Sequence, residues 1–264
     1  MNNILVTGGT GTLGKEVVEQ LAYQKRDVSV LSSRKAPLLP SEITLYRGDL
    51  ATGSGLHKAT ENAKIIIHCA SNPKAPWHVD VKGTENLIKA AKKNQVQHFI
   101  YISIVGIDKS HYAYYSAKSE AEKLIKKSGI PWSILRTTQF HNLVFSLIQS
   151  FKKENSSSIV VPEGLQFQSI DISEVASQLV KLAKEGPKGR LPDTGGPQIL
   201  NIVKMMRIYL KTFDKGHINI KSKPIEGELY DIFRTGFNLC PGNSYGNITW
   251  KKFCSGRRKI SSQT

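Results

Sequence analysis

The chain of 264 residues has few cysteines and shows no pattern of metal ligands. Its three cysteines, Cys69, Cys240 and Cys254, are odd in number and form no C-x-x-C pair. This argues against a disulfide framework and a structural zinc site, and it suits a reducing compartment. The seven histidines are not spaced as ligands, so we expect no metal. His68 lies inside an apolar run and is expected to be a hydrogen-bonded core residue.

Long hydrophobic runs are also missing. No segment reaches the roughly 18 apolar residues that a membrane helix needs, and no basic-then-apolar leader precedes the first predicted strand. There is no G-x-S-x-G motif, so nucleophilic hydrolysis is not supported. We therefore expect a soluble, cytoplasmic protein without a membrane partner.

Acidic residues are outnumbered: 21 Asp and Glu face 37 Lys and Arg, for a formal net charge of +16. The cations are spread along the chain, and only residues 256–259 form a basic cluster. We interpret them as a lysine-rich solvated surface and do not expect nucleic acid as a partner. A basic field would also attract an anionic cofactor.

Short β-rich segments alternate with helical ones in the first half of the chain. Helices are predicted at 15–21, 79–94 and 112–127, and strands at 3–6, 27–31, 42–46, 64–69, 98–102 and 132–135. Right-handed β-α-β crossovers then give an α/β fold with a doubly wound, Rossmann-like parallel sheet.

A glycine-rich run lies between the first predicted strand and the first predicted helix. It reads Thr7-Gly8-Gly9-Thr10-Gly11-Thr12-Leu13-Gly14. Gly9, Gly11 and Gly14 match G-x-G-x-x-G, and Gly8, Gly11 and Gly14 match a wider-spaced variant. Glycines let the backbone turn tightly and approach a pyrophosphate, which the helix N-terminus attracts. The run therefore predicts a dinucleotide site, with all eight residues as candidate contacts.

The regular alternation weakens after residue 150. A short strand is predicted at 168–170, a helix at 173–185 capped by Ser173, and a helix around 203–213. We expect a single NAD(P)-binding domain over residues 1–264. Its nucleotide-binding core spans about 1–154, and a smaller C-terminal substrate lobe spans about 155–264.

The cofactor preference is predicted from the end of the second strand, because ligands of open parallel sheets lie across the carboxyl ends of the strands. Ser32, Ser33 and Arg34 follow that strand, and no acidic residue between Asp27 and Glu42 is placed to accept from the ribose hydroxyls of NAD. The Arg34 guanidinium suits a 2′-phosphate, so NADP (NADPH) is predicted over NAD. The alternative is a solvated loop cation.

Two further strand ends supply candidate cofactor contacts. Asp49 and Leu50 follow the third strand, where the carboxylate either accepts from the adenine amino group or caps the next turn. Cys69, Ala70 and Ser71 follow the fourth strand, where small residues either leave room for a ribose or form a tight turn.

The predicted catalytic residues are Ser103, Tyr114 and Lys118. Ser103 ends the fifth strand, and Tyr114 and Lys118 are four residues apart on one face of the next helix. A lysine ammonium beside the phenol lowers the phenol pKa, so Tyr114 can protonate a carbonyl oxygen while Lys118 holds the nicotinamide ribose. Tyr115 is the alternative to Tyr114.

Together these segments resemble the NmrA-like branch of the short-chain dehydrogenase/reductase superfamily. The similar stretches are 7–14, 101–108, 114–118, 132–140, 171–176 and 195–197. The resemblance implies an NAD(P)H-binding fold, with Thr138 near the cofactor and Gln139 and Phe140 near the substrate. In one departure, Ile104 stands where ordinary members carry the catalytic serine.

The expected function is an NADPH-dependent oxidoreductase that passes hydride to a small-molecule acceptor, such as a quinone or a conjugated carbonyl. Four phenylalanines either supply apolar walls for that acceptor or belong to the core. They are Phe145, Phe167, Phe233 and Phe237. The resemblance also leaves open a non-catalytic NADP-binding redox sensor, which Ile104 favours.

Overall fold

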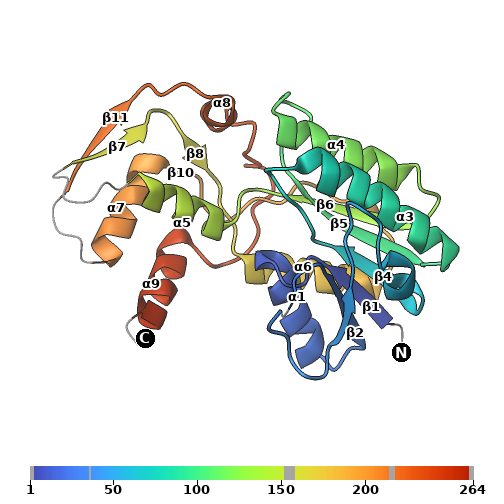
Figure 1. Ribbon diagram of the computed structural model, residues 1–264. Helices are drawn as coiled ribbons and strands as arrows, with labels where there is room; N and C mark the ends of the chain where they lie inside the picture. Colours follow the sequence, from blue (N-terminus) through green and yellow to red (C-terminus); the bar gives the residue numbers. More distant parts are fainter. Residues whose placement is uncertain (1–2, 36, 152–157, 214–217, 262–264) are drawn as a thin grey trace. The chain divides into compact units, whose positions relative to one another are not determined.

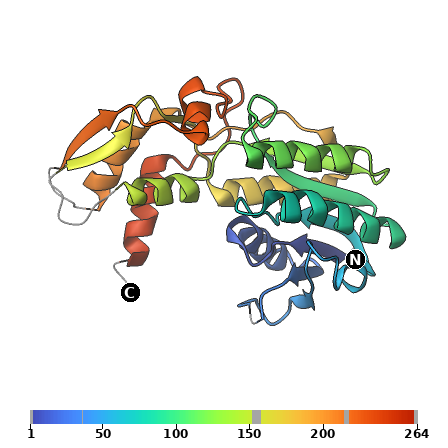
Figure 2. The ribbon, with the colours of Figure 1, turned by 45° about the horizontal axis from the view of Figure 1, so that its top comes forward.

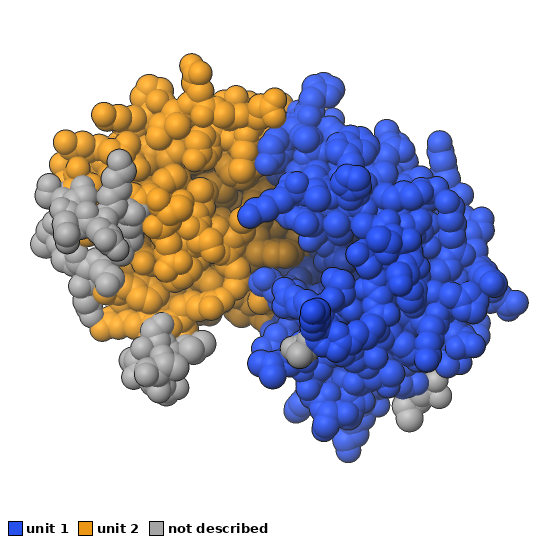
Figure 3. Space-filling model, viewed as in Figure 1, with its two compact units in different colours: residues 1–136, 175–192 blue, residues 137–174, 193–264 orange. Residues whose placement is uncertain are grey.

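The computed structural model describes residues 3–35, 37–151, 158–213 and 218–261. The chain divides into two compact units (Figure 3). Unit 1 comprises residues 1–136 and 175–192, and unit 2 comprises residues 137–174 and 193–264. The boundary expected between residues 154 and 155 lies outside the described residues.

Unit 1 is built on a seven-stranded sheet with the order β3-β2-β1-β4-β5-β6-β9. Its strands are β1 (Asn3–Thr7), β2 (Val28–Ser32), β3 (Thr44–Arg47), β4 (Ala63–His68), β5 (His98–Ile104), β6 (Trp132–Thr137) and β9 (Gly189–Arg190). Leu5 of β1 lies opposite Ser29 on one side and Ile66 on the other, and both pairings are parallel. The predicted doubly wound parallel sheet is confirmed.

Helices lie on both faces of this sheet (Figures 1 and 2). The first face carries α1 (Thr12–Tyr23) and α6 (Ile172–Glu185), and the second carries α3 (Gly83–Lys93) and α4 (Ala113–Lys126), while α2 (Leu56–Thr60) precedes β4. Ala121 and Ile125 of α4 join Phe99 of β5 in one buried apolar cluster, because residues four apart share a helix face. In the described parts of the chain, no helix is long and apolar enough to cross a membrane.

The helix predicted at 79–94 starts with a wider turn than expected. Residues Trp77–Lys82 form a π-helical turn, η1, which continues directly into α3. Turns of this kind are rare and occur often at functional sites. Asp80 of η1 is fully buried, although it is a carboxylate.

The start of α6 differs from the prediction. The helix begins at Ile172, and the Asp171 carboxylate accepts hydrogen bonds from the Ser173 backbone N–H at 2.9 Å and from its hydroxyl at 2.6 Å. The prediction that Ser173 caps the helix is wrong, because Ser173 lies inside the first turn and donates to the cap. Asp171 caps the helix instead.

Unit 2 combines helices with two small sheets. Its helices are α5 (His141–Ser150), α7 (Ile202–Thr212), α8 (Glu228–Thr235) and α9 (Trp250–Ser261). One sheet pairs β8 (Gln166–Phe167) with β10 (Leu200–Asn201), and the other pairs β7 (Ser158–Pro162) with β11 (Asn219–Lys223). The strand predicted at 168–170 thus lies at 166–167, and Ile170 forms only an isolated bridge to Phe140.

Aromatic side chains pack against one another in the core of unit 2. Phe145 contacts Tyr209, Phe213, Trp250 and Phe253, with ring centroids 5.5 to 6.3 Å apart. Elsewhere in the unit, the rings of Phe167 and Phe233 are 4.6 Å apart and both side chains are buried. These contacts favour the core alternative for Phe167 and Phe233, whereas a pocket wall at the half-buried Phe145 stays a prediction.

Candidate functional site

The glycine-rich run forms the turn from β1 into α1, and it packs against the residues that follow β4. Gly8 has a φ of +69°, and a Cβ on it would lie 2.6 Å from the Ala70 backbone nitrogen. A Cβ on Gly14 would lie 2.2 Å from the Gly8 carbonyl oxygen, and one on Gly9 would lie 2.8 Å from Val30. Both predicted glycine registers therefore contain positions that only glycine fills without displacing neighbours.

The N-terminus of α1 has room for an anion. Gly11 is the N-cap, no side chain caps the helix, and the first turn contains no acidic residue. Its first amides and the positive end of its dipole are therefore available to a phosphate. The strand order reverses between β1 and β4, and dinucleotides bind at this point in doubly wound sheets. The glycine cradle, which a Cβ would fill, thus fits the pyrophosphate of NAD(P).

The residues predicted to bind the 2′-phosphate of NADP lie beside this turn. The Arg34 guanidinium donates to the Thr10 carbonyl at 2.9 Å, and the Ser32 hydroxyl lies 3.2 Å from that of Thr10. Arg34 and Ser33 are exposed.

Arg47 is a further cation at this edge, and sequence reasoning missed it. Its guanidinium donates to the backbone carbonyls of Arg34 and Lys35. Arg47 is the last residue of β3 and pairs with Ser32. The signal that could have found it is its place at a strand end next to β2.

The remaining predicted cofactor contacts occupy the neighbouring strand ends. The Asp49 carboxylate accepts from the Ala51 N–H at 2.8 Å, which is the turn-capping alternative, and Leu50 is buried. Burial raises the pKa of the Cys69 thiol to about 12, so this thiol is not a nucleophile at neutral pH. Contact of Asp49 with adenine stays a prediction.

His68 is a core residue, as predicted. Its ring nitrogens lie 2.6 Å from the Thr7 hydroxyl and 2.9 Å from the Thr84 hydroxyl. Burial and the nearby Lys118 lower its pKa to about 3, so the ring is neutral at physiological pH. Among the described residues, no group of three or more His, Cys, Asp or Glu side chains could hold a metal ion.

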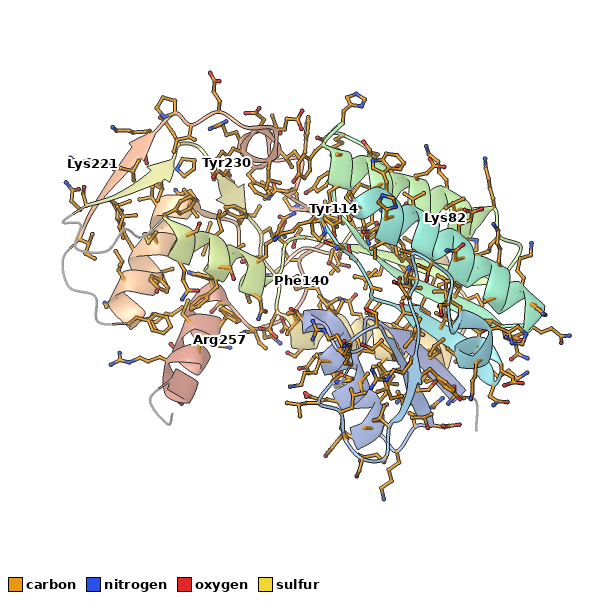
Figure 4. All side chains as sticks on the ribbon, viewed as in Figure 1. Lys82, Tyr114, Phe140, Lys221, Tyr230 and Arg257 are labelled. Atoms are coloured by element: carbon orange, nitrogen blue, oxygen red, sulfur yellow. The ribbon has the colours of Figure 1, made fainter. Side chains whose placement is uncertain are left out.

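Tyr114 and Lys118 belong to one network centred on Asp80, and Tyr114 lies near the start of α4 (Figure 4). The Tyr114 hydroxyl is 2.8 Å from the Ser71 hydroxyl, which donates to Asp80 Oδ1 at 2.6 Å. The Lys118 ammonium lies 3.7 Å from the same carboxylate oxygen and donates to the Ile102 carbonyl at 2.9 Å. Sequence periodicity gave no sign of Asp80, because an acidic residue in a predicted helix resembles a solvated one.

The charges in this network shift two pKa values. Burial above all, and the Asp80 carboxylate, raise the pKa of the Tyr114 phenol. This corrects the expectation that Lys118 lowers it, since the ammonium is directed to Asp80 and Ile102. Burial lowers the pKa of Lys118, while Asp80 opposes this change.

Ser103 and Tyr115 are buried side chains close to this network. Burial raises the pKa of the Glu122 carboxyl, but the hydrogen bonds and charge of Arg136 outweigh it and lower that pKa. Among the described residues, the buried Ser103 hydroxyl has no hydrogen-bond partner. Tyr115 is 3% exposed, whereas Tyr114 is half-buried, which favours Tyr114 over its alternative. The catalytic role of Ser103 stays a prediction.

The predicted residues Thr138, Gln139 and Phe140 belong to unit 2. The Thr138 hydroxyl donates to the Gln168 carbonyl at 2.5 Å, and Gln139 Oε1 accepts from Asn238 at 3.0 Å. Phe140 is half-buried and is the N-cap residue of α5. Unit 2 also contains a cavity of about 550 Å³, lined by 164–166 and 199–204, which sequence reasoning did not predict.

Comparison with solved structures supports the fold. The NADPH-dependent quinone oxidoreductase QOR2 from Escherichia coli superimposes with a TM-score of 0.76 and 16% identity, over 97% of this chain and 99% of that chain. The Bordetella bronchiseptica enzyme WbmH, solved with NAD+, gives 0.73 and 15% over 97% and 96%. Identities this low show the fold alone.

Curated relatives match part of the chain. Photosystem II assembly factor Ycf39 from Cyanophora paradoxa is 34% identical over 147 residues, 52% of this chain and 46% of that protein. The yeast sterol-4-alpha-carboxylate 3-dehydrogenase ERG26 (Saccharomyces cerevisiae) is 28% identical over 124 residues, 40% of this chain and 36% of that protein. Each alignment therefore spans less than half of the relative.

The family is shown by a longer match. Residues 8–185, which include the glycine turn, the Asp80 network and α6, match the sequence model of a family described as NAD(P)H-binding. The chain belongs to this NAD(P)H-binding family.

Proposed function

We propose that the protein is an NADPH-dependent reductase of the NmrA-like type, which reduces a small apolar acceptor such as a quinone or a conjugated carbonyl. The observation that carries the proposal is the position of Tyr114. Its half-buried hydroxyl bonds to Ser71, three residues after β4 ends, and Ala70 of the same segment packs against Gly8 of the dinucleotide turn. A proton donor thus lies close to where the cofactor is expected.

A bound nicotinamide would supply the hydride, and the chain would supply the proton. The raised pKa of Tyr114 keeps its phenol protonated at neutral pH, as a proton donor requires. The Lys118 ammonium offsets the charge of Asp80, which otherwise opposes negative charge developing on the phenol oxygen. Lys118 is 2% exposed, so holding a ribose requires it to turn away from the Ile102 carbonyl.

The preference for NADPH rests on Arg34. Its guanidinium lies against the glycine turn, and Arg47 holds the backbone that carries it. A guanidinium donates two parallel hydrogen bonds to the 2′-phosphate of NADPH, whereas NADH has no phosphate at this position. Arg34→Ala should therefore raise the Kd for NADPH at least tenfold and leave the Kd for NADH almost unchanged.

Turnover would be followed as loss of nicotinamide absorbance, with NADPH and a panel of quinones, enones and aldehydes. Tyr114→Phe should lower kcat at least a hundredfold and leave the NADPH Kd unchanged, because phenylalanine keeps the ring but lacks the proton. Tyr112→Phe, on the residue before α4, is the matched control. Tight NADPH binding without turnover of any acceptor would contradict the proposal.

That last outcome would favour the second candidate, a non-catalytic NADP-binding redox sensor. Ile104 at the position of the usual serine supports it, as does the relative whose name makes it an assembly factor.

A further inference from the structure

Asp80 is a buried carboxylate at the centre of the network around Tyr114, and no motif of the sequence assigns it a role. It is 0% exposed and lies on the π-helical turn η1. The Ser71 hydroxyl and the Asn72 N–H donate to its two oxygens, at 2.6 and 3.0 Å. A buried charge with this many partners is costly to assemble, and such groups are frequent at functional sites.

The number of protons in the network fixes the direction of its hydrogen bonds. A carboxylate only accepts, so the single hydroxyl proton of Ser71 is donated to Asp80. The bond of 2.8 Å between Ser71 and Tyr114 must then be donated by Tyr114. Asp80 therefore directs the phenol proton of Tyr114 without touching Tyr114.

Asp80 also faces the Lys118 ammonium, which is almost as deeply buried. The two groups lie 3.7 Å apart, and Lys118 is 2% exposed. The other titratable groups around Lys118 are Glu122 on its own helix, Cys69 and His68 at the end of β4, and Tyr101 of β5, whose ring centroid lies 4.1 Å from the ammonium. His68 is neutral, and Glu122 is engaged by Arg136. Asp80 is thus the nearest counter-charge to Lys118.

We propose that Asp80 is a positioning residue that acts through two side chains: its charge keeps buried Lys118 an ammonium, and its hydrogen bond with Ser71 holds the Tyr114 hydroxyl in place. This inference rests on the proposed reductase function, in which Tyr114 gives up its proton and the Lys118 ammonium offsets the charge of Asp80, which opposes the phenolate. Burial alone drives a lysine towards the neutral amine, and a neutral amine would leave the charge of Asp80 uncompensated.

The charge of Lys118 is measured directly by NMR of ¹³Cε-labelled lysine, with Lys118→Arg to assign the signal. In the wild-type protein we expect Lys118 to be protonated at pH 7. In Asp80→Asn its titration midpoint should fall by at least one pH unit, and in Asp108→Asn it should not move. Asp108 is a suitable control because its carboxylate also pairs with a cation, Arg136, but is 59% exposed.

Neutral Lys118 in the wild type at pH 7, or an unchanged midpoint in Asp80→Asn, would overturn the proposal. The wild-type measurement does not depend on Asp80→Asn, so the proposal can still be overturned if that variant fails to fold. Because the spectra need no substrate, a protein that turns over no acceptor would contradict the reductase function and leave this result standing.

The hydrogen-bond role is tested by a double-mutant cycle on kcat. If Asp80 acts on Tyr114 through Ser71, Ser71→Ala, which removes the hydroxyl between them, should lower kcat at least tenfold in the wild type but less than threefold in the Tyr114→Phe background. The basic limb of the kcat–pH profile should also move to lower pH in Asp80→Asn, because the pKa of Lys118 falls there. Additive losses would refute the link through Ser71.

Discussion

Gly8→Ala should destabilise the protein far more than the same substitution at another glycine with a similar backbone conformation. Gly8 has a φ of +69°, and an L-residue in left-handed backbone costs about 1–2 kcal/mol. The new Cβ would also lie 2.6 and 2.7 Å from the Ala70 nitrogen and Cα, which are backbone atoms held in a sheet turn. Relieving such an overlap costs about a further 1–3 kcal/mol. The total loss of unfolding free energy is then about 2–5 kcal/mol.

Gly129→Ala provides the matched control. Gly129 has a φ of +77°, but a Cβ there meets nothing within 4 Å, so only the conformational cost of about 1–2 kcal/mol remains. Urea unfolding of both variants measures the difference, and NADPH titration should show at least tenfold weaker binding for Gly8→Ala alone. Equal losses of stability in the two variants would refute the assignment of a steric clash between the turns after β1 and β4.

The remaining predictions concern the N-terminal cap of α6, the buried His68 and the ion pair between Glu122 and Arg136. Asp171→Ala should cost about 1 kcal/mol in urea unfolding because it removes the cap of α6, and Ser173→Ala should cost less; the reverse order would contradict the capping assignment. The pKa of folded His68 is about 3 against 6.5 when unfolded, so its contribution to stability is complete above pH 6.5 and is lost as the pH falls. Between pH 6.5 and 3 the wild type should lose up to about 1.4 kcal/mol per pH unit more than His68→Gln, and parallel stability curves would count against this. The Arg136 guanidinium lies 2.7 and 2.9 Å from the two Glu122 oxygens, and Glu122→Gln removes this buried counter-charge. The unfolding free energy should fall by about 3–5 kcal/mol in thermal or urea unfolding. A loss below about 1 kcal/mol would contradict this prediction.

The sheet and the dinucleotide turn could be predicted because their signals are local. An apolar run such as Ile65–Ile67 and the spacing of Gly8, Gly11 and Gly14 depend on residues adjacent in the chain. The start of α6 was displaced because one residue decides whether Ser173 precedes the helix or lies in its first turn. The phenylalanines were ambiguous because an apolar ring suits a core and a pocket equally well.

The amino-acid sequence alone determined the order of strands and helices, the glycine turn and the four-residue spacing that puts Tyr114 and Lys118 on one helix face, since each follows from backbone geometry over a few residues. Only the tertiary structure decided what these side chains meet. Asp80, Ser71 and Lys118 come from three segments that the parallel sheet brings together, and the π-helical turn carries Asp80 in the core. Burial then reverses the expected shift of the Tyr114 pKa, because desolvation and the charge of Asp80 depend on distance in space.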